Sequence, residues 1–409
     1  MRRKIFFIAA GMLAASQAGA TYMEAPASEP GVITPDSTGF KFTDVKILPT
    51  NSVKDQNKSG TCWAFSGISA LEEEVLRQGG PALDLSEMYT VRNCYIDKAR
   101  KYMRTGGKIN FAQGGGFPDV LYSLENYGVM PEEAYTGLNY GEEKHSHYEM
   151  ANALEAYLNA VMANPNKRLS TAWLPGFIGI LDAYLGKVPE TFTYEGKTYT
   201  PQQFAKAIGL DASDFASYTS YTHHPFYTSF PLEIADNWLW APSRNVPMED
   251  LKAIVDNALE NGYTVAWAAD VSEPTFKWRE GYAVLPEEKG EEDMEGSELA
   301  RWVQLSDADR EKEKSKIKGP VKERVITQES RQRTFDNYET TDDHGMVIVG
   351  YATDQEGNRY YKVKNSWDIN QLYGGYLYVS EPYFLEKTIS VMVNEGAVPS
   401  QISKKFANK

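Results

Sequence analysis

Apolar positions at helical spacing begin directly after a cysteine in the first sixth of the chain. The segment 63–78 carries five of them on one helical face: Phe65, Ile68, Leu71, Val75 and Leu76. Gly79-Gly80-Pro81 then ends the pattern. The sequence therefore predicts an amphipathic helix whose first turn lies next to Cys62.

Other segments repeat this helical spacing as far as about residue 261. The expected helices cover about 86–102, 118–127, 147–163, 202–208 and 248–261. Two stretches between residues 190 and 275 read as strands instead: the short run TFTYEGKTYT at 191–200 and the buried pattern GYTVAWAADV at 262–271.

The last part of the chain has the alternation and apolar runs of a β-sheet. HGMVIVGYA at 344–352, RYYKVKNSW at 359–367 and GGYLYVS at 374–380 each read as a strand, and DQEGN separates the first two as a turn. Helices first and antiparallel strands last predict an α+β protein.

The first twenty residues have a different character. Arg2, Arg3 and Lys4 precede an apolar run that ends in Ala18-Gly19-Ala20, which is typical of a secretory signal peptide. The run is too short to span a bilayer. We expect residues 1–20 to be removed on export to the periplasm or the exterior, and 21–45 to form an extended arm rich in Pro, Ser, Thr and Gly.

Charge excludes some partners. The full chain has a formal net charge of −14, and residues 21–409 carry 39 basic and 56 acidic residues. Such a surface repels nucleic acid and anionic membranes, so neither is an expected partner. The charge-dense stretch 286–333 is predicted to be a solvated helix and loop.

Cys62 has the setting of an activated nucleophile. A thiolate attacks far better than a thiol, and a helix N-terminus together with a nearby imidazolium favours the thiolate. Only one other cysteine exists, Cys94, so at most one disulfide is available. Because a free Cys62 excludes that bridge, we interpret Cys94 as a small buried apolar residue.

The chain has five histidines, and one is placed as a general base needs to be. His344 follows TTDD and opens a predicted strand, which would hold its ring rigidly. His145 and His147 form an H-x-H pair, but no further His or Cys lies nearby, so no metal site is predicted. His223 and His224 lie among aromatic residues and are interpreted as packing residues.

Four motifs, in order, make the chain resemble the papain-like cysteine proteases. They are QNKSGTCWAFS from Gln56, GGGFP at 114–118, DHG at 343–345 and KNSW at 364–367. The resemblance implies a two-lobed fold with a helical lobe and an antiparallel β lobe. It also implies hydrolysis of peptide bonds with no cofactor and no metal.

The same resemblance implies a role for each matching residue. Cys62 is expected to be the nucleophile, with His344 as its base and later the acid for the leaving amine. Asn365 would orient His344, and Gln56 would help to hold the oxyanion with the Cys62 N–H. The residues Gly115, Gly116 and Trp367 are expected at the substrate-binding cleft, with Trp367 also covering the contact between histidine and asparagine.

Several departures narrow the resemblance to one branch. Ser59 and Gln113 stand where secreted relatives carry disulfide cysteines, and Cys62 and His344 are 282 residues apart, about twice the papain spacing. No room is seen for an inhibitory pro-segment. We expect a papain-like domain over 46–399, with an insertion at about 140–240 and a tail at 400–409. These features resemble the bleomycin hydrolase and aminopeptidase C branch.

That branch implies a homohexamer whose C-terminal arm lies in the cleft and restricts the enzyme to free N-termini. The tail here contains Lys404, Lys405 and Lys409, which weakens its attraction for an ammonium group. Three alternatives therefore stay open: an endopeptidase with the same catalytic residues, a Cys-His amidase, and a catalytically silent peptide-binding scaffold.

Overall fold

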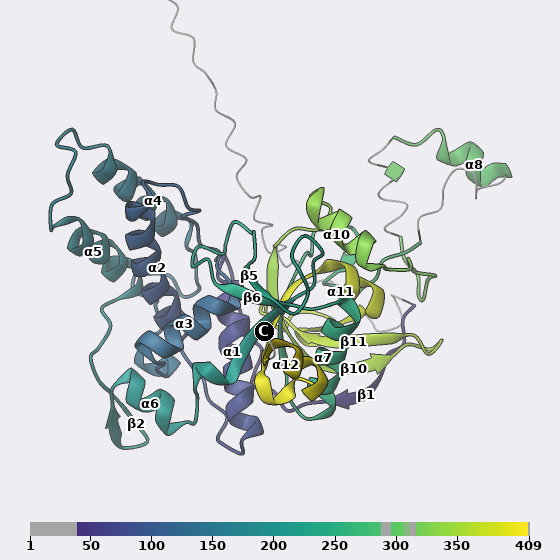
Figure 1. Cartoon of the computed structure of the whole chain (residues 1–409), viewed down its shortest axis with the longest axis horizontal. Coiled ribbons are helices and arrows are strands. Elements are labelled where there is room, and N and C mark those ends of the chain that lie inside the picture. The colour runs from purple at the N-terminus through teal and green to yellow at the C-terminus, as the bar shows by residue number, and fades with distance from the viewer. Residues whose placement is uncertain (1–38, 288–295, 307–308, 311–315, 408–409) are drawn as a thin grey trace, which may run out of the picture.

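The computed structural model describes residues 39–287, 296–306, 309–310 and 316–407 (Figure 1). The predicted signal segment 1–20 and residues 21–38 of the predicted arm lie outside this range. The last part of the arm enters strand β1 (Thr43–Ile47), which pairs antiparallel with β10 (His344–Thr353). No helix within the described ranges is long and apolar enough to cross a membrane.

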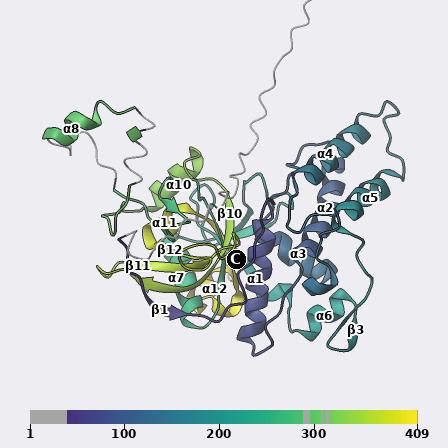
Figure 2. The same cartoon turned by 180° about the vertical axis from the view of Figure 1, so that it is seen from behind.

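The molecule has a helical half and a strand-rich half, with the first helix, α1, between them (Figures 1 and 2). This arrangement confirms the predicted α+β class and the papain-like two-lobed fold.

One apolar core joins the elements of the helical half. These elements are α1 (Cys62–Arg77), α2 (Glu87–Arg104), α3 (Phe117–Tyr127), α4 (Tyr148–Met162), α5 (Trp173–Leu185), α6 (Pro201–Ala207) and the hairpin β2 (Phe192–Tyr194) with β3 (Lys197–Tyr199). The predicted helices match five of them to within about two residues, and the hairpin occupies the predicted β-like run.

Helix α5 was not predicted, because its sequence contains Pro175, Gly176 and Gly179, which have low helix propensity. Tertiary packing stabilises it instead. Phe177 and Leu181 are buried in the helical core, and a Cβ on Gly176 would lie 2.2 Å from the Tyr157 hydroxyl of α4. The two helices therefore approach more closely than larger side chains would allow.

A single sheet organises the other half, in the order β5-β6-β4-β13-β7-β10-β11-β12-β9-β8. Its remaining strands are β4 (Phe215–Thr219), β5 (Ser229–Pro231), β6 (Pro242–Asn245), β7 (Val265–Ala269), β8 (Phe276–Lys277), β9 (Tyr282–Ala283), β11 (Arg359–Lys364), β12 (Tyr376–Ser380) and β13 (Thr388–Asn394). The four strands predicted from 262–271 onwards are confirmed as β7, β10, β11 and β12, whereas the central strand β13 was missed. Strands β4 to β6 come from the predicted insertion and extend the sheet beyond β13.

The remaining helices with described bounds complete the chain. They are α7 (Met248–Glu260), α8 (Gly296–Trp302), α10 (Gln328–Asp336), α11 (Glu381–Lys387) and α12 (Ser400–Ala407), with short 3-10 turns at Glu132–Ala134, Ala212–Asp214 and Glu395–Ala397. One of these helices, α8, lies apart from the sheet (Figure 1).

The prediction of a solvated segment at 286–333 is wrong for its second half. From residue 316 the chain packs onto the molecule, and Arg331 of α10 is fully buried. The Arg331 guanidinium donates to the carbonyls of Ser220 and Leu385, each at 2.8 Å. A buried guanidinium is tolerated because backbone acceptors satisfy its donors, which a count of charged residues cannot reveal.

A buried ion pair ties α1 to the sheet. The Lys364 ammonium of β11 lies 3.0 Å from the Glu73 carboxylate of α1 and 2.9 Å from the Ser69 hydroxyl. Both charged side chains are almost completely buried. Burial raises the pKa of Glu73, which Lys364 partly offsets.

We predict that Lys364→Met destabilises the protein by about 3 kcal/mol or more near neutral pH, because it leaves Glu73 buried and unpaired. The deficit should shrink as the pH falls towards the raised pKa of Glu73, since a protonated carboxyl tolerates burial. Urea denaturation midpoints across pH measure this effect. The matched control is the double variant with Glu73→Gln, which should recover most of the loss; a double variant as unstable as Lys364→Met would contradict the prediction.

Candidate active site

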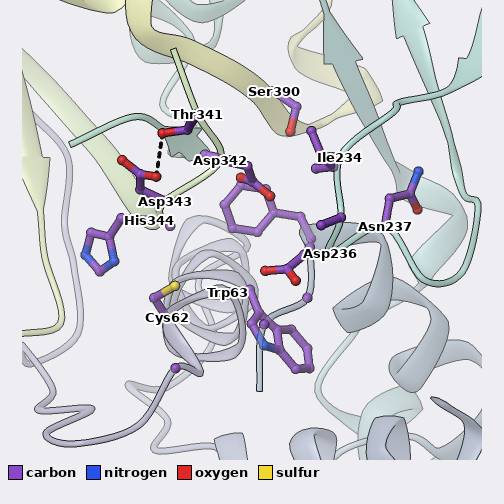
Figure 3. Close-up of a pocket in the computed structure, with 18 of the residues that line it drawn as sticks. Cys62, Trp63, Ile234, Asp236, Asn237, Thr341, Asp342, Asp343, His344 and Ser390 are labelled. Atoms are coloured by element: carbon purple, nitrogen blue, oxygen red, sulfur yellow. Dashed lines mark hydrogen bonds between the residues drawn. The ribbon is translucent and has the colours of Figure 1, made fainter. Parts of the chain in front are cut away.

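Cys62 is the first residue of α1, and its thiol is free and partly exposed to a large pocket (Figure 3). The preceding Thr61 makes no side-chain cap and shares a 2.6 Å hydrogen bond with the Ser59 hydroxyl instead. The first N–H groups of α1 have no acceptor within the helix. They are available to stabilise negative charge at the sulfur or on a bound substrate.

His344 begins β10, and the next residue lets α1 come close to that strand. A Cβ on Gly345 would lie 2.6 Å from the Ser66 hydroxyl and 3.4 Å from the Cys62 carbonyl oxygen. The N–H of Gly345 hydrogen-bonds to the Cys62 sulfur. The absence of a side chain at residue 345 therefore brings the thiol and the imidazole to the same end of the pocket (Figure 3).

Asn365 and Trp367 fix the imidazole. The Asn365 Oδ1 atom lies 2.7 Å from His344 Nε2 and also accepts the Ser366 N–H at 2.7 Å. Because that backbone donor identifies the atom as oxygen, His344 Nε2 must carry the proton and Nδ1 keeps a lone pair. The Trp367 ring stacks on the imidazole with centroids 4.4 Å apart and covers it.

Gln56 connects the segment before α1 to the segment after β11. Its Oε1 atom accepts from the Ser366 hydroxyl at 2.7 Å, and its Nε2 donates to the Ser59 carbonyl at 2.8 Å. An amide nitrogen has two hydrogens, so one remains available at the wall that Gln56 shares with Cys62. This is the arrangement an oxyanion-binding pair requires.

The glycines that precede α3 form the facing wall. A Cβ on Gly115 would lie 2.4 Å from the Asp119 carboxylate and 2.9 Å from the Trp63 ring, so no side chain fits there. Gly116 caps α3 and donates its N–H to Asp119 at 3.1 Å. Glycine thus leaves this backbone open to the pocket, where an extended peptide can approach it.

Hydrogen bonds hold the loop that precedes Cys62. They are made by the two residues, Ser59 and Gln113, that stand where secreted relatives carry disulfide cysteines. Gln113 Oε1 accepts the Gly60 N–H at 2.8 Å, and its carbonyl accepts the Trp63 indole N–H at 3.1 Å. The Ser59 hydroxyl donates to the Gln56 carbonyl at 2.8 Å. Both cysteines are free, and Cys94 is buried in the helical core as interpreted from the sequence.

The electrostatics favour a neutral resting pair. Burial, together with the carboxylates of Asp342 and Asp236, raises the pKa of the Cys62 thiol to about 12, and the N–H groups of Gly345 and Trp63 oppose this shift. Burial lowers the pKa of His344 to about 4, against the hydrogen bond that His344 donates to Asn365. Both groups line the empty pocket in their neutral forms, and the imidazole keeps a free lone pair on Nδ1.

The pocket has a volume of about 1060 Å³ and includes side chains that the sequence analysis did not single out. Asp342 and Asp236 point into it beside Cys62, and Ser390 lies on the same wall (Figure 3). Asp342 is part of the TTDD run before His344, so its proximity could have been inferred. Asp236 lies in the loop between β5 and β6, and no local sequence pattern marks it.

The remaining histidines lie away from the nucleophile. His145 and His147 are buried, and burial lowers the pKa of the first to about 4 and of the second to about 3. His224 stacks on Phe230 with ring centroids 4.0 Å apart, as a packing residue does.

His223 and His224 also meet one carboxylate. Their Nε2 atoms lie 2.9 and 3.0 Å from Glu233, close enough for the three side chains to surround a metal ion. However, Gln332 accepts the Thr222 N–H and therefore turns its Nε2 donor towards His223 Nδ1. His223 then carries its proton on Nε2, which favours a hydrogen bond to Glu233 over a metal ligand.

Helix α12 packs on the face of the sheet opposite the pocket. Ser217 and Ser243 line the pocket, whereas their strand neighbours Tyr218 and Arg244 point the other way and contact Phe406 of α12. Ile402 is buried in the core of the strand-rich half. Through Phe406, therefore, the C-terminal segment contributes nothing to the pocket wall.

Comparisons with known proteins agree with this site. Residues 40–172 match the model of the papain family cysteine proteases, and residues 323–409 match the peptidase C1-like family. The two matched ranges contain the described residues of the cysteine loop and the histidine strand, respectively. The chain is a papain-like cysteine peptidase.

Two relatives and one solved structure align with most of the chain. Aminopeptidase C of Lactobacillus delbrueckii subsp. lactis is 21% identical over 88% of this chain and 83% of its own, and bleomycin hydrolase of Rattus norvegicus is 22% identical over 86% and 82%. A crystal structure of PepW from Lactobacillus rhamnosis HN001 superposes with a TM-score of 0.67 at 19% identity, covering 90% of this chain and 85% of that one. The chain is similar to the aminopeptidase C and bleomycin hydrolase branch over most of its length.

We predict that His344→Ala lowers kcat/KM by about 10²–10⁴-fold, the usual contribution of a general acid–base group. Asn365→Ala should cost less, because it removes orientation and leaves proton transfer possible. Steady-state kinetics on one peptide substrate compare the two. An equal or larger loss for Asn365→Ala, with an unchanged thermal midpoint, would contradict the assigned hierarchy.

Proposed function

We propose that this protein is an exported cysteine aminopeptidase that hydrolyses the first peptide bond of its substrates through Cys62, His344 and Asn365. One observation carries the proposal. The thiol at the N-terminus of α1 shares a pocket with an imidazole whose Nε2 atom lies 2.7 Å from Asn365 Oδ1. The names of the relatives support the aminopeptidase mode.

In the proposed reaction His344 Nδ1 takes the proton from Cys62 as the sulfur attacks the substrate carbonyl. The Cys62 N–H and the free Gln56 hydrogen stabilise the oxyanion; one such donor is worth about 3–4 kcal/mol in the transition state. The imidazolium then protonates the leaving amine, and Asn365 holds the ring in the orientation both transfers need. Water releases the product acid from the thioester.

We predict that Cys62→Ala abolishes turnover while the fold persists, since the thiol makes no structural bond. The substrates are an aminoacyl-coumarin with a free N-terminus and its acetylated twin, measured with residues 21–409 under reducing conditions. The wild type should cleave the free form selectively, lose activity at acid pH as His344 is protonated, and be unaffected by a chelator. Residual turnover by Cys62→Ala would overturn the catalytic assignment.

An endopeptidase remains the second candidate, and one observation favours it. The residues of α12 through Phe406 lie across the sheet from the pocket, so they do not close the cleft on the side of the substrate's N-terminus. Cleavage of the acetylated twin as fast as the free form would establish this mode and reject the aminopeptidase.

We also propose that the mature form is a homohexamer that begins after Ala20. The basic, apolar and small-residue pattern of residues 1–20 supports export, and the branch to which the chain is similar supports the assembly. N-terminal sequencing of protein from the periplasmic fraction tests the first, and light scattering on a sizing column tests the second. An intact Met1, or a monomer at assay concentration, would contradict the respective proposal.

A further inference from the structure

Two carboxylates enter the pocket beside the nucleophile from different parts of the chain. Asp342 belongs to the segment that leads into β10, and Asp236 to the loop between β5 and β6 (Figure 3). Each lies close enough to Cys62 to raise the pKa of its thiol. Negative charge beside the sulfur does not help the thiol to ionise, so the two carboxylates must have another role.

Asp236 is held in place by its contacts with Asn110 and Gly114. Its Oδ1 accepts a hydrogen bond from Asn110 Nδ2 at 2.8 Å. Its Oδ2 lies so close to Gly114 that a Cβ on that residue would be only 1.8 Å away. Lys98 is the cation that most lowers the pKa of Asp236, but its ammonium donates to the carbonyls of Ala112 and Gly114 behind the wall. The pocket side of Asp236 is therefore open to a ligand.

Asp342 has unmet acceptors. No hydrogen-bond donor reaches its carboxylate from the residues that the structure describes, and burial together with Asp236 and Asp343 raises its pKa well above the usual range. Its neighbour Asp343 differs, because Thr341 Oγ1 and the Val271 N–H donate to it. A partly buried carboxylate without a protein donor, next to a second carboxylate, is stabilised by a cation.

The rest of the lining agrees with a cationic ligand. Beside these two residues the pocket is lined by the acidic Asp119, Glu233, Asp336 and Asp343, and by the basic Lys58. Glu233 is already paired with two histidines at the rim. The C-terminal segment through Phe406 lies across the sheet, so its described residues neither supply nor neutralise charge here.

The position of the two carboxylates beside Cys62 distinguishes two kinds of cation (Figure 3). In the first residue of a peptide, the ammonium nitrogen is separated from the attacked carbonyl carbon by one Cα, about 2.5 Å in all. The ammonium of a lysine side chain extends roughly 6 Å from its own Cα. Because Asp342 and Asp236 lie beside Cys62 in the pocket (Figure 3), they are better placed for the α-ammonium.

We propose that Asp342 and Asp236 bind the α-ammonium of the substrate's first residue and so restrict cleavage to free N-termini. The inference rests on the proposed cysteine peptidase function and replaces the C-terminal arm as the source of the carboxylate.

The test compares the wild type with the isosteric variants Asp342→Asn and Asp236→Asn on the free and acetylated aminoacyl-coumarins. Each variant should lower kcat/KM for the free substrate by about 10- to 100-fold, the effect of losing one charge-assisted hydrogen bond, and change the acetylated one by less than about threefold. Glu260→Gln is the control, because its carboxylate pairs with Lys46 and Tyr351 outside the pocket, and should stay within twofold of the wild type.

Alkylation of Cys62 by iodoacetamide gives a readout that needs no turnover. Leucinamide should slow alkylation of the wild type while N-acetyl-leucinamide does not, and Asp342→Asn should lose this difference. With the pocket empty, both Asn variants should alkylate faster at a given pH, because removing a negative charge lowers the thiol pKa. An unchanged alkylation profile would show that neither carboxylate acts on the sulfur.

The outcomes separate the two proposals. A wild type that cleaves both substrates equally rejects the aminopeptidase mode itself. A wild type that prefers free N-termini, with variants that keep this preference or lose both activities equally, rejects only the ammonium site. Variants that lose only acetylated substrates with Lys or Arg next to the cleaved residue would show that the carboxylates bind a side chain.

Discussion

The active site depends on one close contact between the two halves of the molecule, where the start of α1 meets the start of β10. Gly345 has no room for a side chain, since the Ser66 hydroxyl occupies the place of its Cβ. That contact sets the distance between a thiol and an imidazole that are 282 residues apart in sequence. The buried Lys364–Glu73 pair and the Gln56–Ser366 hydrogen bond hold the same two halves on either side of it.

Burial at this contact disfavours both a thiolate and an imidazolium, and the hydrogen bonds determine which atom can still accept a proton. An isolated thiolate or imidazolium is disfavoured there, as the shifts of both pKa values show. Asn365 nevertheless places the only exchangeable proton of the imidazole on Nε2, so Nδ1 is always ready to accept. Burial thus opposes ionisation of either group in the empty pocket, while the free lone pair on Nδ1 can accept a proton.

The parts of this site that lie in continuous sequence motifs could be predicted from the sequence. Cys62 at a helix start, His344 at a strand start and Asn365 at the end of the next strand could be predicted, because each motif is continuous and its element has a clear period. The fold class followed from the same patterns. Helix α5 and the buried charged half of 286–333 could not be predicted, because packing there overrides helix propensity and the usual exposure of arginine. Asp236 was missed for a different reason: it reaches the pocket only through the tertiary arrangement of β5, β6 and the Gly114 wall.

The hydrogen bonds of Gln113 and Ser59 give the nucleophile loop a framework that contains no sulfur. Cys94 is enclosed in the helical core, so Cys62 is the one cysteine thiol of the chain that solvent can reach. Redox chemistry is thereby uncoupled from folding: a reductant strong enough to keep the nucleophile active has no disulfide to break. In the proposed mechanism, oxidation would inactivate the enzyme at the Cys62 sulfur alone and would leave the fold intact.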